Sequence, residues 1–175
     1  MQLSGTVGSS HSVEYFAGVF SGGLVINSPQ AHYHAAAARA AVHVWHGLQI
    51  AGDVYRSFSA PAQREKTRQS VETRYVRGLL TVDVEYLWGS DGKTDKRGGY
   101  ALAVWHWSKK WEGLVRDDWY TSNVSKANAR TQTWLAGANC YLWTNTRIEA
   151  DAGLRQEPAS VRLSGLFLTQ LQIGF

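Results

Sequence analysis

Hydrophobic and polar residues alternate along most of this chain of 175 residues. Successive side chains of a β-strand point to opposite faces, so this alternation predicts strands with one apolar and one polar face. The clearest case is residues 160–175. One parity of that segment is largely apolar, whereas the other is more polar; the apolar parity includes Leu163, Phe167, Leu171, Ile173 and Phe175.

The same pattern predicts about eleven strands of roughly ten residues, the length of a membrane-crossing strand. They comprise residues 2–8, 13–20, 33–45, 48–57, 68–77, 79–89, 100–108, 111–121, 131–143, 146–156 and 160–175. Tight turns are expected at 9–12, 46–47, 78, 109–110 and 144–145, and longer loops at 21–30, 58–67, 90–99, 122–130 and 157–159. An antiparallel meander would gather all the tight turns at one end, an arrangement typical of outer-membrane β-barrels.

Alternation by itself is compatible with two classes of barrel. In residues 146–156, for example, Arg147 and Glu149 share one parity, and Ile148 and Ala150 share the other. A soluble barrel directs its apolar face inward, whereas a porin directs it toward lipid and keeps a polar interior.

The positions of the aromatic residues favour the membrane class. On the apolar faces, one group falls at strand ends that lead to longer loops and another at ends beside tight turns or the terminus. The first group is Trp88, Trp119 and Trp134, and the second is Trp45, Trp105, Trp107, Trp111 and Phe175. Two aromatic rings around an aliphatic band are typical of a membrane barrel. The sequence therefore predicts an all-β fold, an antiparallel transmembrane β-barrel that forms one domain over residues 1–175.

Composition excludes several other classes of protein. The formal charge is +4, but Lys and Arg are scattered, so no nucleic-acid-binding patch is expected. A single cysteine, Cys140, excludes an internal disulfide framework and argues against a cysteine metal site. No nucleophile paired with a base is apparent, and no metal or cofactor is implied, so no enzymatic activity is expected.

Several phrases resemble the phosphate-selective porin O and P family. They lie at residues 13–22, 72–78 continuing to 85–86, 112–118 and 170–175. The alternating C-terminal segment with a final aromatic also resembles the signal by which the barrel-assembly machinery recognises outer-membrane strands; its residues are Phe167, Leu171, Ile173 and Phe175. Asp117 departs from the pattern, because an aromatic residue is usual between Arg116 and Asp118.

The resemblance implies a Gram-negative outer-membrane porin for passive diffusion of small ions or solutes, with anions or phosphate as candidate preferred permeants. Family members are sixteen-stranded homotrimers, and the resemblance covers only their C-terminal part. An odd strand number also departs from the even numbers of single-chain bacterial barrels. We therefore expect a partial or open barrel that lacks N-terminal strands.

Charged residues of the inward parity are the candidates for lining a pore. They are Arg39, Arg74, Asp83, Glu85, Glu112, Arg116, Asp118, Arg147, Glu149 and Arg162. Arginine forks suit phosphate oxygens, but acidic and basic residues nearly balance, so cross-strand ion pairs on a wet wall are the simpler interpretation.

Two features of the sequence allow more than one interpretation. Tyr100, Leu102 and Val104 share the inward parity although they are apolar, which suggests a register slip, a bulge or a covering loop. The rival to a porin is a soluble lipocalin-like barrel or sandwich that binds a hydrophobic ligand.

Overall fold

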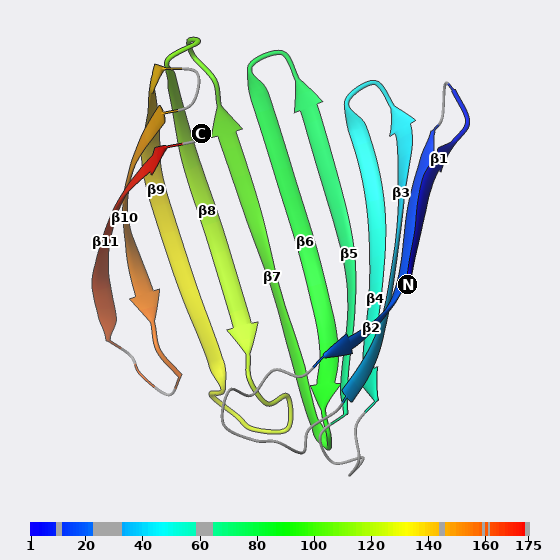
Figure 1. Ribbon diagram of the computed structural model, residues 1–175. Helices are drawn as coiled ribbons and strands as arrows, with labels where there is room; N and C mark the ends of the chain where they lie inside the picture. Colours follow the sequence, from blue (N-terminus) through cyan, green and yellow to red (C-terminus); the bar gives the residue numbers. More distant parts are fainter. Residues whose placement is uncertain are drawn as a thin grey trace.

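The computed structural model is a single antiparallel sheet of eleven strands among the residues that it describes (Figure 1). These are residues 1–9, 12–22, 33–58, 65–143, 146–158, 160 and 162–173. The strands are β1 (Gln2–Val7), β2 (Val13–Gly22), β3 (Tyr33–Trp45), β4 (Leu48–Phe58), β5 (Lys66–Arg77), β6 (Leu80–Asp91), β7 (Thr94–Trp105), β8 (Trp111–Thr121), β9 (Arg130–Trp143), β10 (Thr146–Gln156) and β11 (Leu163–Ile173). Each strand pairs with its neighbours in sequence, so the sheet is a meander and the all-β prediction is confirmed.

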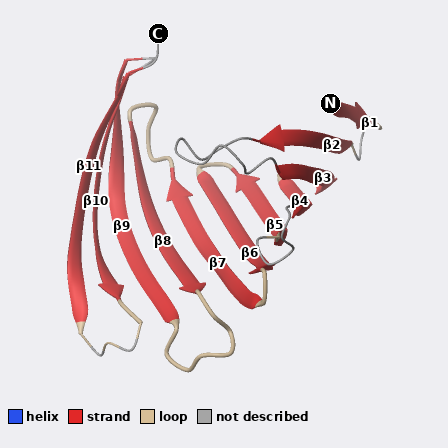
Figure 2. Ribbon diagram, turned by 60° about the horizontal axis from the view of Figure 1, so that its bottom comes forward, coloured by secondary structure: helices blue, strands red, loops and turns tan. Residues whose placement is uncertain are grey.

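The sheet bends into an open trough (Figure 2). Its outer strands, β1 and β11, are not paired with each other among the described residues. The arrangement is that of a partial or open barrel. The described residues include no helix that is long and apolar enough to cross a membrane.

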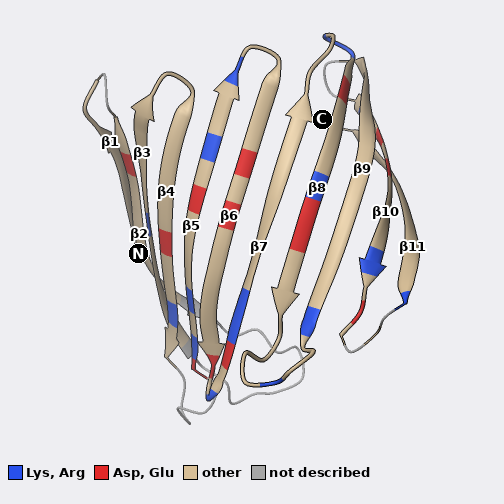
Figure 3. Ribbon diagram, turned by 180° about the vertical axis from the view of Figure 1, so that it is seen from behind, with Lys and Arg blue, Asp and Glu red and all other residues tan. Residues whose placement is uncertain are grey.

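Strand register divides the side chains into two continuous faces. Glu149 lies opposite Asn139, and Asn139 opposite Glu112, so these three side chains share one face of β8 to β10. The same register extends from β1 to β11, and we name this side the charged face. Figure 3 shows acidic and basic residues along the middle of β5 and β8, and acidic residues along the middle of β6. The opposite side, which carries Val115 and Ile148, is the apolar face.

Burial shows that the charged face is the concave one. Concave curvature crowds side chains, and convex curvature separates them. By register, all but Thr121 of the following buried residues lie on the charged face: Ala35, Ala41, Ala51, Ser57, Thr81, Glu112, Thr121, Asn139 and Asp151. The apolar face instead carries most of the exposed large hydrophobic residues of the strands.

The meander places successive connections at alternate ends of the sheet, as predicted. The loops predicted at 21–30 and 58–67 and the turn at 144–145 lie wholly or largely outside the described residues. Two other bounds were wrong. The turn predicted at 109–110 is a connection over residues 106–110. The loop predicted at 90–99 is a two-residue turn, Gly92–Lys93, between β6 and β7. Gly92 has a φ of 59°, which suits the first position of a tight hairpin turn. Strand pairing therefore continues to Asp91 and Thr94.

Two other expectations about the strands were wrong. No register slip occurs at Tyr100, Leu102 and Val104, which pair regularly with β6 and β8 and lie on the charged face. Irregularities occur instead at His43/Trp45 and Thr146/Arg147, beside the turns. β11 begins at Leu163, so Ser160 and Arg162 precede it, whereas Val161 and Phe175 fall outside the described residues.

Candidate functional site: the charged face of the sheet

Nine of the ten candidate pore-lining residues lie in strands on the charged face. They are Arg39, Arg74, Asp83, Glu85, Glu112, Arg116, Asp118, Arg147 and Glu149. The tenth, Arg162, lies in the connection before β11, where its backbone N–H donates to Ser160 Oγ at 3.1 Å. The predicted strand began too early, because β11 starts at Leu163, one residue after Arg162.

Arg39 connects three strands of this face. Its Nη1 donates to Asp53 Oδ2 on β4 at 2.7 Å, and its Nη2 donates to Glu72 Oε2 on β5 at 2.8 Å. Glu72 lies directly opposite Glu85 on β6, a like-charge pairing that destabilises a sheet unless it is compensated. The Arg39 guanidinium supplies that compensation from the far side of Glu72.

Glu112 is the centre of a second network, near the tight-turn end. Its residue is only 6% exposed, and its Oε1 accepts hydrogen bonds from Asn139 Nδ2 at 2.6 Å and Tyr141 Oη at 2.8 Å. Its Oε2 lies 2.7 Å from His106 Nδ1. A buried carboxylate is costly unless hydrogen-bonded, and these three partners satisfy both of its oxygens.

Three side chains of this network were missed by sequence reasoning. Asn139 and Tyr141 flank Cys140, so strand alternation already placed them on the charged face. Both are uncharged, so charge did not mark them as candidates. His106 was assigned to a strand but lies in the connection after β7.

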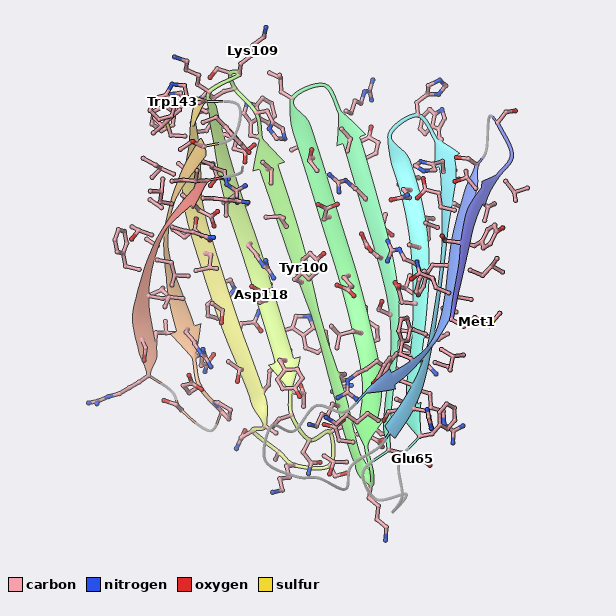
Figure 4. All side chains as sticks on the ribbon, in the orientation of Figure 1. Met1, Glu65, Tyr100, Lys109, Asp118 and Trp143 are labelled. Carbon is pink, nitrogen blue, oxygen red and sulfur yellow. The ribbon has the colours of Figure 1, made fainter. Side chains whose placement is uncertain are left out.

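Tyr100 lies on the charged face by strand register, and Arg116 covers its ring. The Arg116 Cζ is 4.8 Å from the ring centroid, a cation–π geometry. The same guanidinium donates from Nε and Nη2 to Asp118 Oδ1, at 2.9 and 2.8 Å. Tyr100 and Asp118 lie near mid-height of the sheet (Figure 4). The apolar residue is thus part of the charged wall.

Carboxylates engage the arginines along the charged face. Arg74 Nε lies 3.7 Å from Asp83 Oδ1, and Arg147 Nη2 lies 3.1 Å from Glu149 Oε2. The strands of this face carry basic residues Arg39, Lys66, Arg68, Arg74, Lys96, Arg116, Arg147 and Arg155, and acidic residues Glu14, Asp53, Glu72, Asp83, Glu85, Asp91, Glu112, Asp118, Glu149 and Asp151. The described wall therefore has no excess of positive charge.

The apolar face carries aromatic residues at both ends of the strands. At the end of the longer loops lie Trp88, Trp119 and Trp134. At the other end, Trp45 is 68% exposed and Trp143 is 71% exposed. Trp143 was missed in the sequence, although it also ends a predicted strand beside a predicted tight turn. Trp105, Trp107 and Trp111 are likewise exposed at this end.

The apolar face also carries the described part of the candidate assembly signal. Phe167, Leu171 and Ile173 lie on this face of β11 and are exposed, Phe167 by 71%. Asp117 shares the apolar face but accepts a hydrogen bond from Gln132 Nε2. It lies opposite Trp134, level with the tryptophans at the longer-loop end of the sheet.

Among the described residues, no group of three or more His, Cys, Asp or Glu side chains is arranged to hold a metal ion. The chemistry of the charged face is therefore that of paired ions and hydrogen bonds along a concave wall.

Comparisons with protein-family models, curated proteins and solved structures gave no match. The resemblance to the porin O and P family thus stays a hypothesis drawn from the sequence.

Proposed function

We propose that this chain forms wall strands of an outer-membrane channel through which small ions and solutes diffuse passively, without catalysis. One observation carries this proposal: the concave face holds the charges, and the convex face holds exposed apolar residues between two groups of tryptophans. A membrane barrel has this arrangement, with water inside and lipid outside.

The soluble lipocalin-like alternative requires the opposite arrangement. A barrel that binds a hydrophobic ligand needs an apolar concave surface, whereas this concave surface carries Arg39, Glu72, Glu112 and Glu149. Large exposed residues such as Trp143 and Phe167 on the convex face would also be unfavourable in water.

A lipid bilayer does not tolerate the open edge of a sheet, because its backbone N–H and C=O groups would lack partners. The proposal therefore includes closure of the edges at β1 and β11 by further strands. The sequence resembles sixteen-stranded trimeric porins, and in such a porin the further strands belong to the same barrel. We also propose that the assembly machinery recognises β11 through Phe167, Leu171, Ile173 and Phe175.

Anion or phosphate preference is a separate proposal, implied only by the resemblance. The described wall argues for weak selectivity, because carboxylates engage its arginines.

Planar-bilayer recording tests the proposal on protein extracted from its own membranes. We expect stepwise conductance, and a reversal potential in a KCl gradient reports ion preference. Glu85→Gln on the charged face should shift that potential toward anions, whereas Val84→Ala on the apolar face should not. A correctly folded protein that never conducts would contradict the channel.

A further inference from the structure

A basic pocket lies on the apolar side of the sheet, under the loop between β8 and β9. It is a cavity of about 250 Å³. Its polar and aromatic lining consists of Arg97, Trp119, Thr121, Lys126, Asn128 and Arg130. None of the described residues that line it is acidic. Three positive charges around one hollow distinguish it from the charged face, where cations and carboxylates are paired.

Strand register brings two of these arginines together. Thr121 on β8 lies opposite Arg97 on β7 and Arg130 on β9, so the two arginines flank it on one face. Neighbouring strands are about 4.8 Å apart, so their backbones are separated by roughly 10 Å. Two guanidinium groups on long side chains can meet across that interval on one phosphate-sized anion.

The pocket is ordered by contacts that do not involve a ligand. Arg130 Cζ lies 5.0 Å from the ring centroid of Trp119, which holds the guanidinium against the indole. The loop above is fixed by a hydrogen bond from Val124 N–H to Asp95 O at 2.9 Å. It is closed by another from Ser122 N–H to Ala129 O at 3.2 Å. Little ordering is therefore needed when an anion binds.

The pocket lies at the level of the lipid headgroups if the strands cross a membrane as proposed. Arg97 is directly opposite Trp88, and Trp119 forms part of the pocket itself. Tryptophans of membrane proteins concentrate at the headgroup level, where basic pockets bind anionic lipids. A second hollow shares Asn128 and Arg130 and is also lined by Gln132, Gln156 and the carboxylate of Glu157. It offers hydrogen bonds to an uncharged polar part of the same headgroup.

We propose that Arg97, Lys126 and Arg130 bind the phosphate group of an anionic lipid in the leaflet that surrounds this end of the barrel. Arg97 and Arg130 provide paired donors, and Lys126 provides a point charge from the loop. The proposal rests on the membrane placement but is independent of any role of the charged face in conduction.

Native mass spectrometry of the full protein in an uncharged detergent tests this site. The probes are short-chain phosphatidic acid and, for comparison, zwitterionic phosphatidylcholine of the same chain length. We expect a phosphatidic acid adduct that is about tenfold or more weaker in Arg97→Gln/Arg130→Gln, because each charged hydrogen bond lost costs substantial affinity. Arg130→Lys should be intermediate, because it keeps the charge but loses the planar fork.

The matched control is Lys109→Gln/Lys110→Gln, which removes the same charge from the tight-turn end. It should bind like the wild type. Equal loss in both double variants, equal binding of the two lipids, or full displacement by millimolar inorganic phosphate would overturn the proposal. Bilayer recording of the wild-type preparation separates the two proposals. A folded wild type that never conducts contradicts the channel, whereas a conducting wild type that does not prefer phosphatidic acid contradicts the lipid site alone.

Discussion

Arg39 on β3 contacts Glu72 on β5 at 2.8 Å, across the intervening strand β4. A side chain reaches over a neighbouring strand in this way on the inner side of a curved sheet, where side chains converge. This ion pair therefore belongs to the concave wall. It also compensates the direct pairing of Glu72 with Glu85.

The first prediction concerns this compensation. Arg39→Gln should lower the free energy of unfolding by about 1 kcal/mol, a small value because the pair is partly exposed to water. Arg39→Lys should lower the free energy of unfolding by less, because it keeps the charge. It should still lower it, because lysine cannot bridge both carboxylates equally well. Urea unfolding in lipid vesicles, followed by tryptophan fluorescence, measures both. Stability unchanged in Arg39→Gln would show that Glu72 and Glu85 need no compensation.

The second prediction concerns the buried carboxylate of Glu112. Glu112→Ala leaves Asn139 Nδ2 and Tyr141 Oη without their acceptor, and should cost about 1–3 kcal/mol of unfolding free energy. Glu112→Gln keeps one acceptor oxygen and should therefore lower the free energy of unfolding clearly less than Glu112→Ala does. The same unfolding assay compares the two variants. If they are equally stable, the hydrogen bonds to Glu112 do not support the wall.

The third prediction compares two glycines in tight turns. Gly47 and Gly78 have φ angles of 78° and 60°, so alanine at either position costs about 1 kcal/mol of backbone strain. A Cβ at Gly47 would also collide with the Val76 carbonyl oxygen, whereas a Cβ at Gly78 meets no atom within 4 Å. Gly47→Ala should therefore destabilise the protein more than Gly78→Ala. Equal unfolding midpoints would refute the close approach of this turn to β5.

Much of the fold could be predicted from sequence alternation, because the two faces of each strand meet different surroundings and so differ in polarity at alternate positions. The strand at the C-terminal end, for instance, directs Phe167 and Leu171 to the apolar face as expected. The hairpin at Gly92 was missed for a physical reason. Beyond Trp88 both faces are polar, so alternation fades although backbone pairing continues to Asp91. The Asp91-Gly92 dipeptide was the available signal, since such pairs favour tight hairpin turns.

The two candidate sites differed in how far the sequence could predict them. The charged face was predictable because its residues follow strand parity. Its individual partners were not, since Arg39 and Glu72 are brought together by curvature and not by spacing. The basic pocket could not be predicted from the sequence for a related reason. Arg97 was assigned to the loop at 90–99, and Lys126 and Arg130 were assigned to the loop at 122–130. Strand register places Arg97 and Arg130 on either side of Thr121, and the loop between β8 and β9 adds Lys126.

In the proposed channel, lipid contacts the apolar face and water contacts the charged face. Spin labels at four consecutive positions of β5, residues 70–73, test it in protein reconstituted into vesicles, with Cys140→Ala to remove the native thiol. Electron paramagnetic resonance then compares collisions with oxygen, which concentrates in lipid, and with a water-soluble nickel complex. We predict nickel access at Ser70→Cys and Glu72→Cys, and oxygen access at Val71→Cys and Thr73→Cys. Nickel access at Val71→Cys and Thr73→Cys, with labels at 70 and 72 shielded from it, would contradict the account.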